Sequence, residues 1–431
     1  MTTLAEPLAI SSLLRLDEGF VHSDVYTSPA IFEREIEQIF HRGWVYVGHD
    51  SEIPEHGDYV LRWIGRQSVI MNRDTHGNVH LFMNRCRHRA NSVCQFESGN
   101  SAFFRCAYHG WTYKNDGELV GVPYAEGAYE PDFDKSAFSL VPAPRMATYR
   151  GFVWGSLSAE GPSLDDHLGP AAKHAIDLFC DHSPVGEIEV RHGANKSVIY
   201  ANWKFQGGDG YHPPFTHQAD FGTMRNQRAG RPSPLLGMIK KDTTLSRDLG
   251  NGHFCLDLRT MGRSPLPDTP WARAYLDSML DAYGTERAAY IMNSGGPHSI
   301  LMPNIQLLNP DLRVLRPIAA DQFEITFYCA FLKGVPKEVN TARLRLTESR
   351  MGPAGSVNVD DVEMFERNQL GMRQRVEPWK YIGRGMTREF VDNDVGAPPE
   401  YRYENCRVAH YSDELTQRAQ LRWWAAQMER P

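Results

Sequence analysis

The chain has 431 residues, of which 41% are hydrophobic, and its 46 Lys and Arg against 53 Asp and Glu give a formal net charge of −7. This length predicts about two or three domains. The sequence has no basic block, which argues against nucleic acid as a partner. It also lacks both a run of roughly 18 apolar residues and a basic, then apolar, N-terminus, so we expect neither a membrane span nor a secretion signal.

Seven cysteines are present, and five of them fall at scattered positions with no pairing framework. Cysteines of this kind are usually buried, and they stay reduced inside cells. We therefore expect reduced thiols of a cytoplasmic protein at Cys94, Cys180, Cys255, Cys329 and Cys406.

The first clear element is an amphipathic helix predicted over residues 28–43. Ser28 is a candidate cap, Pro29 suits the first turn, and Gly43 ends the pattern. The apolar residues recur at helical spacing and are Ile31, Ile36, Ile39 and Phe40.

From about residue 45 to 158 the sequence consists of short alternating segments, such as DYVLRWI and SVIMNR, separated by Gly, Pro, Asn and Asp. This pattern predicts a small all-β domain. The segment 151–157, GFVWGSL, reads as its last strand.

Two loops of this β region carry a cysteine and a histidine each: C-x-H at Cys86 and His88, and, after seventeen residues, C-x-x-H at Cys106 and His109. A Rieske [2Fe–2S] centre needs this set, because two Cys hold one iron and two His hold the other. The alternative is a structural zinc site, although zinc pairs usually join Cys with Cys and His with His. Gly110 and Trp111 also suit a tight apolar loop. We therefore expect a one-electron relay of moderate potential.

The longer C-terminal region mixes strand and helix patterns, and so predicts an α+β fold. A hairpin is expected over 314–332, with its turn at 319–322. Helical patterns occupy about 270–293, 354–375 and 412–429.

A second metal site is indicated by Asp209, His212 and His217. Two imidazoles and a carboxylate form the facial triad of non-haem Fe(II) oxygenases. Residues five apart on a straight helix lie roughly 140° apart around the axis, so the histidines need a break between them. Pro213 and Pro214 provide one.

The best candidate for the carboxylate is Asp361, on a helix that we expect to open at Pro353. Val357 and Phe365, four residues before and after it, place Asp361 on the apolar face, whereas Asp360 should face outward more. A carboxylate on a buried face needs a partner, and a metal is one. The alternative is a solvated acidic patch.

Together these residues resemble the α subunit of Rieske non-haem iron ring-hydroxylating oxygenases. The resemblance covers nearly the whole chain. It is carried by the entry segment 32–59, both cluster loops, NWK at 202–204, D-x-Y-H-x4-H, GPAG-x4-DD and the terminal SDELTQRAQLRWW.

The resemblance implies that His212, His217 and Asp361 bind the mononuclear iron. It also implies that Asp209 bridges the two centres, with the cluster ligand His109 contributed by a neighbouring subunit. The implied fold is an all-β Rieske domain (45–158) inserted into a catalytic domain (1–44 and 159–431). That catalytic domain has a twisted antiparallel sheet surrounded by helices, of the helix-grip or START-like type.

The family also implies partners. Assemblies are α3, or α3β3 with a small β subunit, and NAD(P)H supplies electrons through a reductase, often with a ferredoxin. The expected reaction is hydroxylation, and specifically cis-dihydroxylation, of a small aromatic substrate with O2; an aromatic carboxylate is one candidate. Alternatives are a Rieske monooxygenase or demethylase, or an electron-transfer metalloprotein whose mononuclear site does not function.

One departure from the family concerns the segment before Asp209. Only 205–208 separate NWK from this aspartate, so the chain is about one helical turn short. Loss of a whole turn keeps the same face toward the iron, but it could instead displace Asp209. We expect the glycines here to give the backbone the freedom to accommodate the cut.

Residues near the iron are candidates for the substrate pocket, with core packing as the alternative for each. They are Phe205, Gln206, Phe215, His298 and Met302.

Overall fold

The structure is a computed structural model that describes residues 9–210, 244–259, 266–293, 298–352, 355 and 357–430. The chain divides into two compact units, Phe40–Leu164 and Met1–Ile39 with Asp165–Pro431. Strands dominate the first unit, and the second combines a large sheet with helices, so the expected α+β class is confirmed. No helix in the described ranges has the length and apolar character that crossing a bilayer requires.

The Phe40–Leu164 unit consists of three small antiparallel sheets. Their orders are β11-β12-β3, β6-β5-β4-β7 and β10-β9-β8. The predicted last strand is confirmed as β12, which pairs with β11 and β3. The strands are β3 (Val45–His49), β4 (Asp58–Ile64), β5 (Gln67–Arg73), β6 (Val79–Met83), β7 (Ser98–Asn100), β8 (Phe103–Arg105), β9 (Thr112–Lys114), β10 (Leu119–Gly121), β11 (Arg145–Tyr149) and β12 (Phe152–Ser156), with the short helix α3 (Ala125–Ala128) after β10.

The predicted N-terminal helix is confirmed as α2 (Pro29–Glu35), which continues as a π-helical turn, Ile36–His41. The Ser28 hydroxyl accepts a hydrogen bond from the N–H of Ile31 at 3.4 Å, so Ser28 caps the helix as expected. All four residues of the apolar stripe are buried. Glu35, at the end of α2, is also fully buried, although its charge gave no sign of this.

The second unit is built on a nine-stranded antiparallel sheet of the described residues, in the order β14-β20-β19-β18-β17-β16-β15-β24-β23. Ala319 pairs with Gln322, so the predicted hairpin is confirmed. The strands are β14 (Ala194–Ile199), β15 (Leu245–Gly250), β16 (His253–Asp257), β17 (His298–Leu301), β18 (Ile305–Leu308), β19 (Asp311–Ala319), β20 (Gln322–Cys329), β23 (Phe390–Asp392) and β24 (Cys406–His410).

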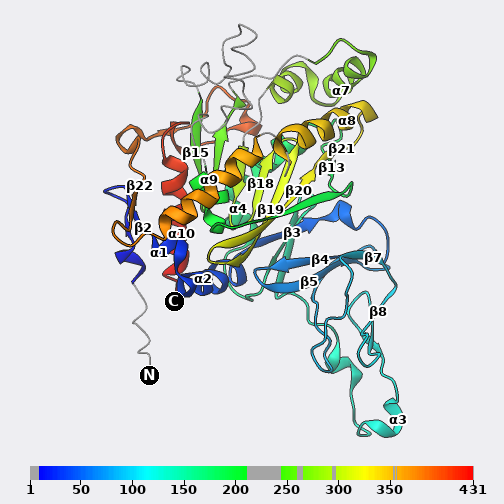
Figure 1. The fold of residues 1–431 in the computed structure, drawn as a ribbon. Coiled ribbons are helices and arrows are strands. Elements are labelled where there is room, and N and C mark those ends of the chain that lie inside the picture. The colour runs from blue at the N-terminus through cyan, green and yellow to red at the C-terminus, as the bar shows by residue number, and fades with distance from the viewer. Residues whose placement is uncertain are drawn as a thin grey trace. The chain divides into compact units, whose positions relative to one another are not determined.

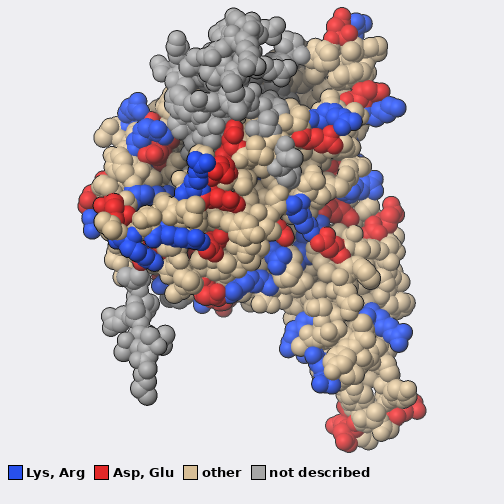
Figure 2. Space-filling view, viewed as in Figure 1, with Lys and Arg blue, Asp and Glu red and all other residues tan. Residues whose placement is uncertain are grey.

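Helices surround this sheet, and the three predicted helical patterns are present as α7, α9 and α10 (Figure 1). The expected opening of the second one at Pro353 is wrong, because α9 begins at Asn358. The longer helices are α4 (Leu164–Cys180), α7 (Pro270–Asn293), α8 (Lys337–Leu346), α9 (Asn358–Met372) and α10 (Leu415–Met428). Smaller elements are α1 (Asp24–Thr27), the sheet β1 (Leu14–Arg15), β2 (Phe20–His22) and β22 (Trp379–Tyr381), and the pair β13 (Ile188–Glu189) and β21 (Phe331–Leu332). On the face drawn in Figure 2, acidic and basic side chains are interspersed.

Candidate iron centres

The four predicted cluster ligands lie in two loops of the same geometry. In the loop after β6, the N–H of Cys86 donates to the carbonyl of Asn91 at 2.8 Å, and its carbonyl accepts from the N–H of Ala90 at 3.1 Å. Between β8 and β9, Cys106 makes the corresponding bonds with Trp111 and Gly110, at 2.8 and 2.9 Å. The fourth residue after each cysteine has positive φ, 64° at Ala90 and 74° at Gly110. The tight loop predicted at Gly110 is therefore present, and it occurs twice.

These loops bring like ligands together. The two cysteines are 2% exposed, and their thiols interact with each other. The rings of His88 and His109 are half-buried, and their centroids lie 4.5 Å apart. A pair of thiols beside a pair of imidazoles is the grouping that the two irons of a Rieske cluster require.

Hydrogen-bond donors point at both sulfurs. The Tyr113 hydroxyl lies 3.2 Å from the Sγ of Cys86, and the side-chain amide of Asn91 lies 3.7 Å from the Sγ of Cys106. Burial raises the pKa of the Cys86 thiol. Burial also acts to raise the pKa of Cys106, but the N–H of Tyr108 and further donors outweigh it and lower that pKa. Donors of this kind stabilise the thiolate form that binds metal.

The histidine side of the site is suited to ligation as well. The Nδ1 of His88 is buried and has no hydrogen-bond partner among the described residues. Burial, followed by the charges of His109 and Arg89, lowers the pKa of His88, which favours the neutral imidazole that binds metal. Its ring stacks on Trp111 at 5.0 Å, and this contact holds the ring plane. The residues present therefore fit a [2Fe–2S] cluster.

The mononuclear site falls partly outside the described residues. His212, His217 and Phe215 lie outside them, and the side chain of Asp209, in the 3-10 turn Gly208–Gly210, is not described. Asp361 lies on α9. The assignment of these residues to an iron site stays a prediction.

The two aspartates of α9 are less different than the sequence pattern suggests. Val357 and Phe365 are buried as expected, with 5% and 4% of their surfaces exposed. Asp360 and Asp361 are both half-buried, and each has one fully buried carboxylate oxygen. Burial alone therefore does not single out Asp361.

The segment that precedes Asp209 packs against α9. The Asn202 side chain caps a 3-10 turn, Trp203–Gln206, and its backbone N–H donates to the side chain of Gln369 at 2.9 Å. The ring of Phe205 lies 6.4 Å from that of Phe365 and stacks on Tyr26 at 5.0 Å. The fold thus places two parts of the predicted iron site, residues 205–210 and α9, side by side.

Of the described pocket candidates, Phe205, Gln206 and Met302 are buried, and His298 on β17 is half-buried. The Gln206 amide donates to Gln306 at 3.1 Å, while its own oxygen is buried and has no partner among the described residues. The N–H of Met302 donates to the Nδ1 of His253 at 2.9 Å. Phe205 packs as a core residue, whereas Gln206 presents a buried oxygen that a ligand could satisfy.

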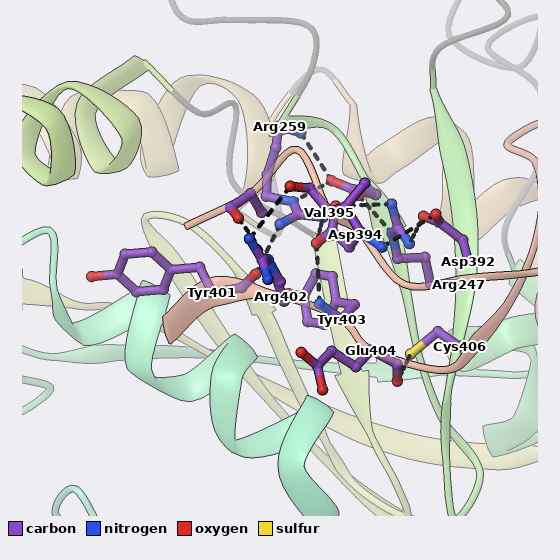
Figure 3. Close-up of polar contacts among 12 residues, drawn as sticks. Arg247, Arg259, Asp392, Asp394, Val395, Tyr401, Arg402, Tyr403, Glu404 and Cys406 are labelled. Carbon is purple, nitrogen blue, oxygen red and sulfur yellow. Dashed lines mark hydrogen bonds and ion pairs between the residues drawn. The ribbon is translucent and has the colours of Figure 1, made fainter. Parts of the chain in front are cut away.

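A buried network of charges was not anticipated from the sequence (Figure 3). Arg247 Nε lies 2.7 Å from Asp257, and Arg259 Nη2 lies 2.8 Å from Asp394. Burial of Asp257 opposes its ionisation, but the two arginines outweigh this effect and lower its pKa to about 2. A further contact to Asp392 ties β15 and β16 to β23 and the following loop. The available signal was a pair of charged residues two positions apart where each of two strands ends, Asp257 and Arg259 at β16 and Asp392 and Asp394 at β23.

A second missed group surrounds Glu35. Its carboxylate accepts from the indole N–H of Trp203 at 2.8 Å and of Trp424 at 2.6 Å, and it pairs with Lys204 at 2.5 Å. The side chains of Lys204 and Glu35 are both 0% exposed. The available signal was a glutamate at the end of an otherwise apolar helix face.

Known proteins similar to this chain contain the same two kinds of domain, one for an iron–sulfur cluster and one for ring hydroxylation. Residues 43–140 match the Rieske [2Fe-2S] domain family, and residues 182–429 match the family described as the ring hydroxylating alpha subunit (catalytic domain). The chain is 35% identical to the anthranilate 1,2-dioxygenase large subunit of Acinetobacter baylyi, over 84% of this chain and 79% of that protein. It is 34% identical to the toluate 1,2-dioxygenase subunit alpha of Pseudomonas putida, over 97% and 94%.

Solved structures show the same fold. The crystal structure of naphthalene 1,2-dioxygenase from Rhodococcus sp. bound to indole superposes with a TM-score of 0.82 at 26% identity, and the match covers 98% of each chain. The two matched domains imply a [2Fe–2S] cluster and a mononuclear iron. The chain therefore belongs to the family of ring-hydroxylating oxygenase α subunits.

Proposed function

We propose that this chain is the terminal oxygenase component that hydroxylates an aromatic carboxylate, by cis-dihydroxylation of its ring, with O2 and electrons from NAD(P)H. The observation that carries the proposal is the similarity along nearly the full chain to toluate 1,2-dioxygenase subunit alpha, because toluate is an aromatic carboxylate. The similarity to anthranilate 1,2-dioxygenase supports the same substrate class.

The residues divide into two groups of ligands. Cys86, His88, Cys106 and His109 would hold the cluster, and His212, His217 and Asp361 would hold the mononuclear iron. When bound, the cluster supplies single electrons at moderate potential and the iron supplies the site of dioxygen activation. The chain itself orients the ligands, directs donors at the sulfurs and covers the cluster loops with apolar side chains such as Trp111.

The proposal extends to partners. A reductase, alone or with a ferredoxin, would deliver the electrons, and the chain would assemble as α3 or α3β3. In such a trimer Asp209 of one subunit would connect to His109 of its neighbour, so the oligomer would be part of the electron path.

Oxygen uptake tests the proposed function. The purified protein is combined with a generic reductase, ferredoxin and NADH, and a panel of aromatic acids and hydrocarbons is added one by one, with product identification. We expect an aromatic acid to trigger uptake and to yield a cis-diol. A dealkylated or singly hydroxylated product would instead show a demethylase or monooxygenase, and no product with any substrate would contradict the proposal.

Iron analysis tests the same proposal independently of substrate. An oxygenase should contain one mononuclear iron in addition to the cluster iron. A protein with cluster iron alone would be an electron-transfer protein, and zinc without iron would contradict both centres.

A further inference from the structure

The shortened segment before Asp209 lies along one stripe of the C-terminal helix α10. The stripe is made of Thr416, Gln420 and Trp424, which we call the α10 stripe. Residues four apart on a helix lie on the same face, one turn above the next, so three successive turns of α10 contribute to it. Thr416 and Gln420 are 1% exposed and Trp424 is 0% exposed.

Gln420 holds the segment on both sides of Gly207. Its side-chain oxygen accepts from the backbone N–H of Gly208, and its side-chain amide donates to the carbonyl of Lys204 at 3.3 Å. One turn earlier, the Thr416 hydroxyl lies 3.2 Å from the carbonyl oxygen of Gly208 and 2.9 Å from the side-chain oxygen of Gln417, so these two acceptors share its proton. Two side chains of α10 therefore contact both backbone polar groups of Gly208, the residue directly before Asp209.

One turn later, Trp424 fixes the start of the same segment through Glu35. The Glu35 carboxylate accepts from the indoles of Trp424 and Trp203 and pairs with Lys204. Because this group is fully buried, moving any one donor would leave a buried charge poorly solvated. Residues 203 and 204 are thus linked to α10 through Glu35.

The glycines of the segment allow this close approach. A Cβ built on Gly207 would lie 2.5 Å from the side-chain oxygen of Gln420, and one on Gly208 would lie 2.5 Å from the carbonyl oxygen of Thr416. Gly207 has φ of −82°, which is not the left-handed region that favours glycine. We expected these glycines to supply backbone freedom; what the structure requires of them is space beside α10.

We propose that the α10 stripe supports the backbone of residues 203–208, with Gln420 as the positioning residue that fixes the backbone directly before Asp209. The proposal rests on the proposed function, because Asp209 is a proposed part of the electron path, and its preceding backbone is held by a helix at the other end of the chain.

The test compares Gln420→Leu with the matched control Gln427→Leu, a buried glutamine of the same helix beyond the stripe. Three readouts are taken on the full-length protein after reconstitution with ferrous iron: the visible spectrum of the cluster, the thermal midpoint, and the electron paramagnetic resonance signal that appears when nitric oxide is added to the reduced protein. The last reports mononuclear iron without any substrate.

We expect Gln420→Leu to keep the cluster spectrum while its nitric oxide signal falls roughly tenfold. Its thermal midpoint should also fall below that of the control, because the buried N–H of Gly208 loses its acceptor, whereas the carbonyl of Lys204 still accepts from the N–H of Gly207 at 3.1 Å. Thr416→Val removes one hydroxyl at nearly constant volume, and it should lower the nitric oxide signal by less than Gln420→Leu does. This variant replaces Gln420→Leu in the test if Gln420→Leu does not fold. If both variants gave a nitric oxide signal equal to that of the control, the proposed role of the α10 stripe would be overturned.

These outcomes separate the two proposals. A wild-type protein with a full nitric oxide signal but no product from any aromatic acid would contradict the proposed function and leave the variant comparison valid. A wild-type protein that lacks the signal under the same reconstitution would contradict both.

Discussion

The buried pair of Glu35 and Lys204 predicts a large and asymmetric effect of mutation on stability. Both side chains are 0% exposed, and the carboxylate accepts three donors, of which Lys204 carries the only charge. Lys204→Met keeps the length of the side chain but leaves a buried carboxylate with two neutral indole donors. Removing one partner of a buried pair costs about 3–5 kcal/mol. For a unit that spans Met1–Ile39 and Asp165–Pro431, that corresponds to a thermal midpoint lower by about 5–8 °C.

A double-mutant cycle measures the pair itself. Glu35→Gln in the Lys204→Met background removes the uncompensated charge while preserving an acceptor for the indoles, so we expect it to recover about half of the loss. Thermal unfolding of the four proteins, followed by circular dichroism, gives the coupling.

The matched control is the exposed pair of Lys333 and Glu187, whose nitrogen–oxygen distance of 2.6 Å is similar but whose side chains are 45% and 59% exposed. Lys333→Met should cost less than about 1 kcal/mol, since solvent screens an exposed pair. If Lys204→Met and Lys333→Met lowered the midpoint equally, the argument from burial would be refuted.

Three further predictions concern pH and the cluster loops. Asp257 has a pKa lowered to about 2, below its unfolded value near 3.9, so its contribution to stability is complete above pH 4 and is lost as the pH falls toward 2; Asp257→Asn should flatten the denaturation midpoint over that window. Burial lowers the pKa of His253 to about 4, so the unfolded chain binds a proton on this side chain before the folded chain does. The free energy of unfolding should therefore decrease as the pH falls from about 6.5 to 4. His253→Gln should weaken this dependence on pH, measured by urea titrations. Gly110→Ala places a Cβ at a φ of 74° and 3.0 Å from Pro123, and it should destabilise the cluster loop by about 1–2 kcal/mol, seen as faster loss of the cluster's absorbance in denaturant. Ala90→Gly at the equivalent position of the other loop is the control and should not accelerate that loss; a faster loss there would argue against backbone strain as the cause.

Local spacing was sufficient to predict the cluster loops, the N-terminal helix, the hairpin of β19 and β20 and the three long helices. A cysteine and a histidine two or three residues apart can occupy one loop whatever the rest of the chain does. Helix and strand periods likewise depend on neighbours a few residues away. The helical period also placed Asp361 on an apolar face. It did not distinguish Asp361 from Asp360, because both side chains are half-buried on α9.

Contacts between distant residues were decided only by the tertiary structure. Glu35 and Trp424 are 389 positions apart, and Gln420 and Gly208 are 212 apart. The sequence places Glu35 at the end of an apolar helix face, but it does not identify the partners of its carboxylate, which the 3-10 turn at Trp203 and the last helix supply. The sequence by itself indicated which side chains are candidates to bind iron. The contact of α10 with the backbone before Asp209 was decided by the tertiary structure, since only the folded chain brings residues more than 200 positions apart together.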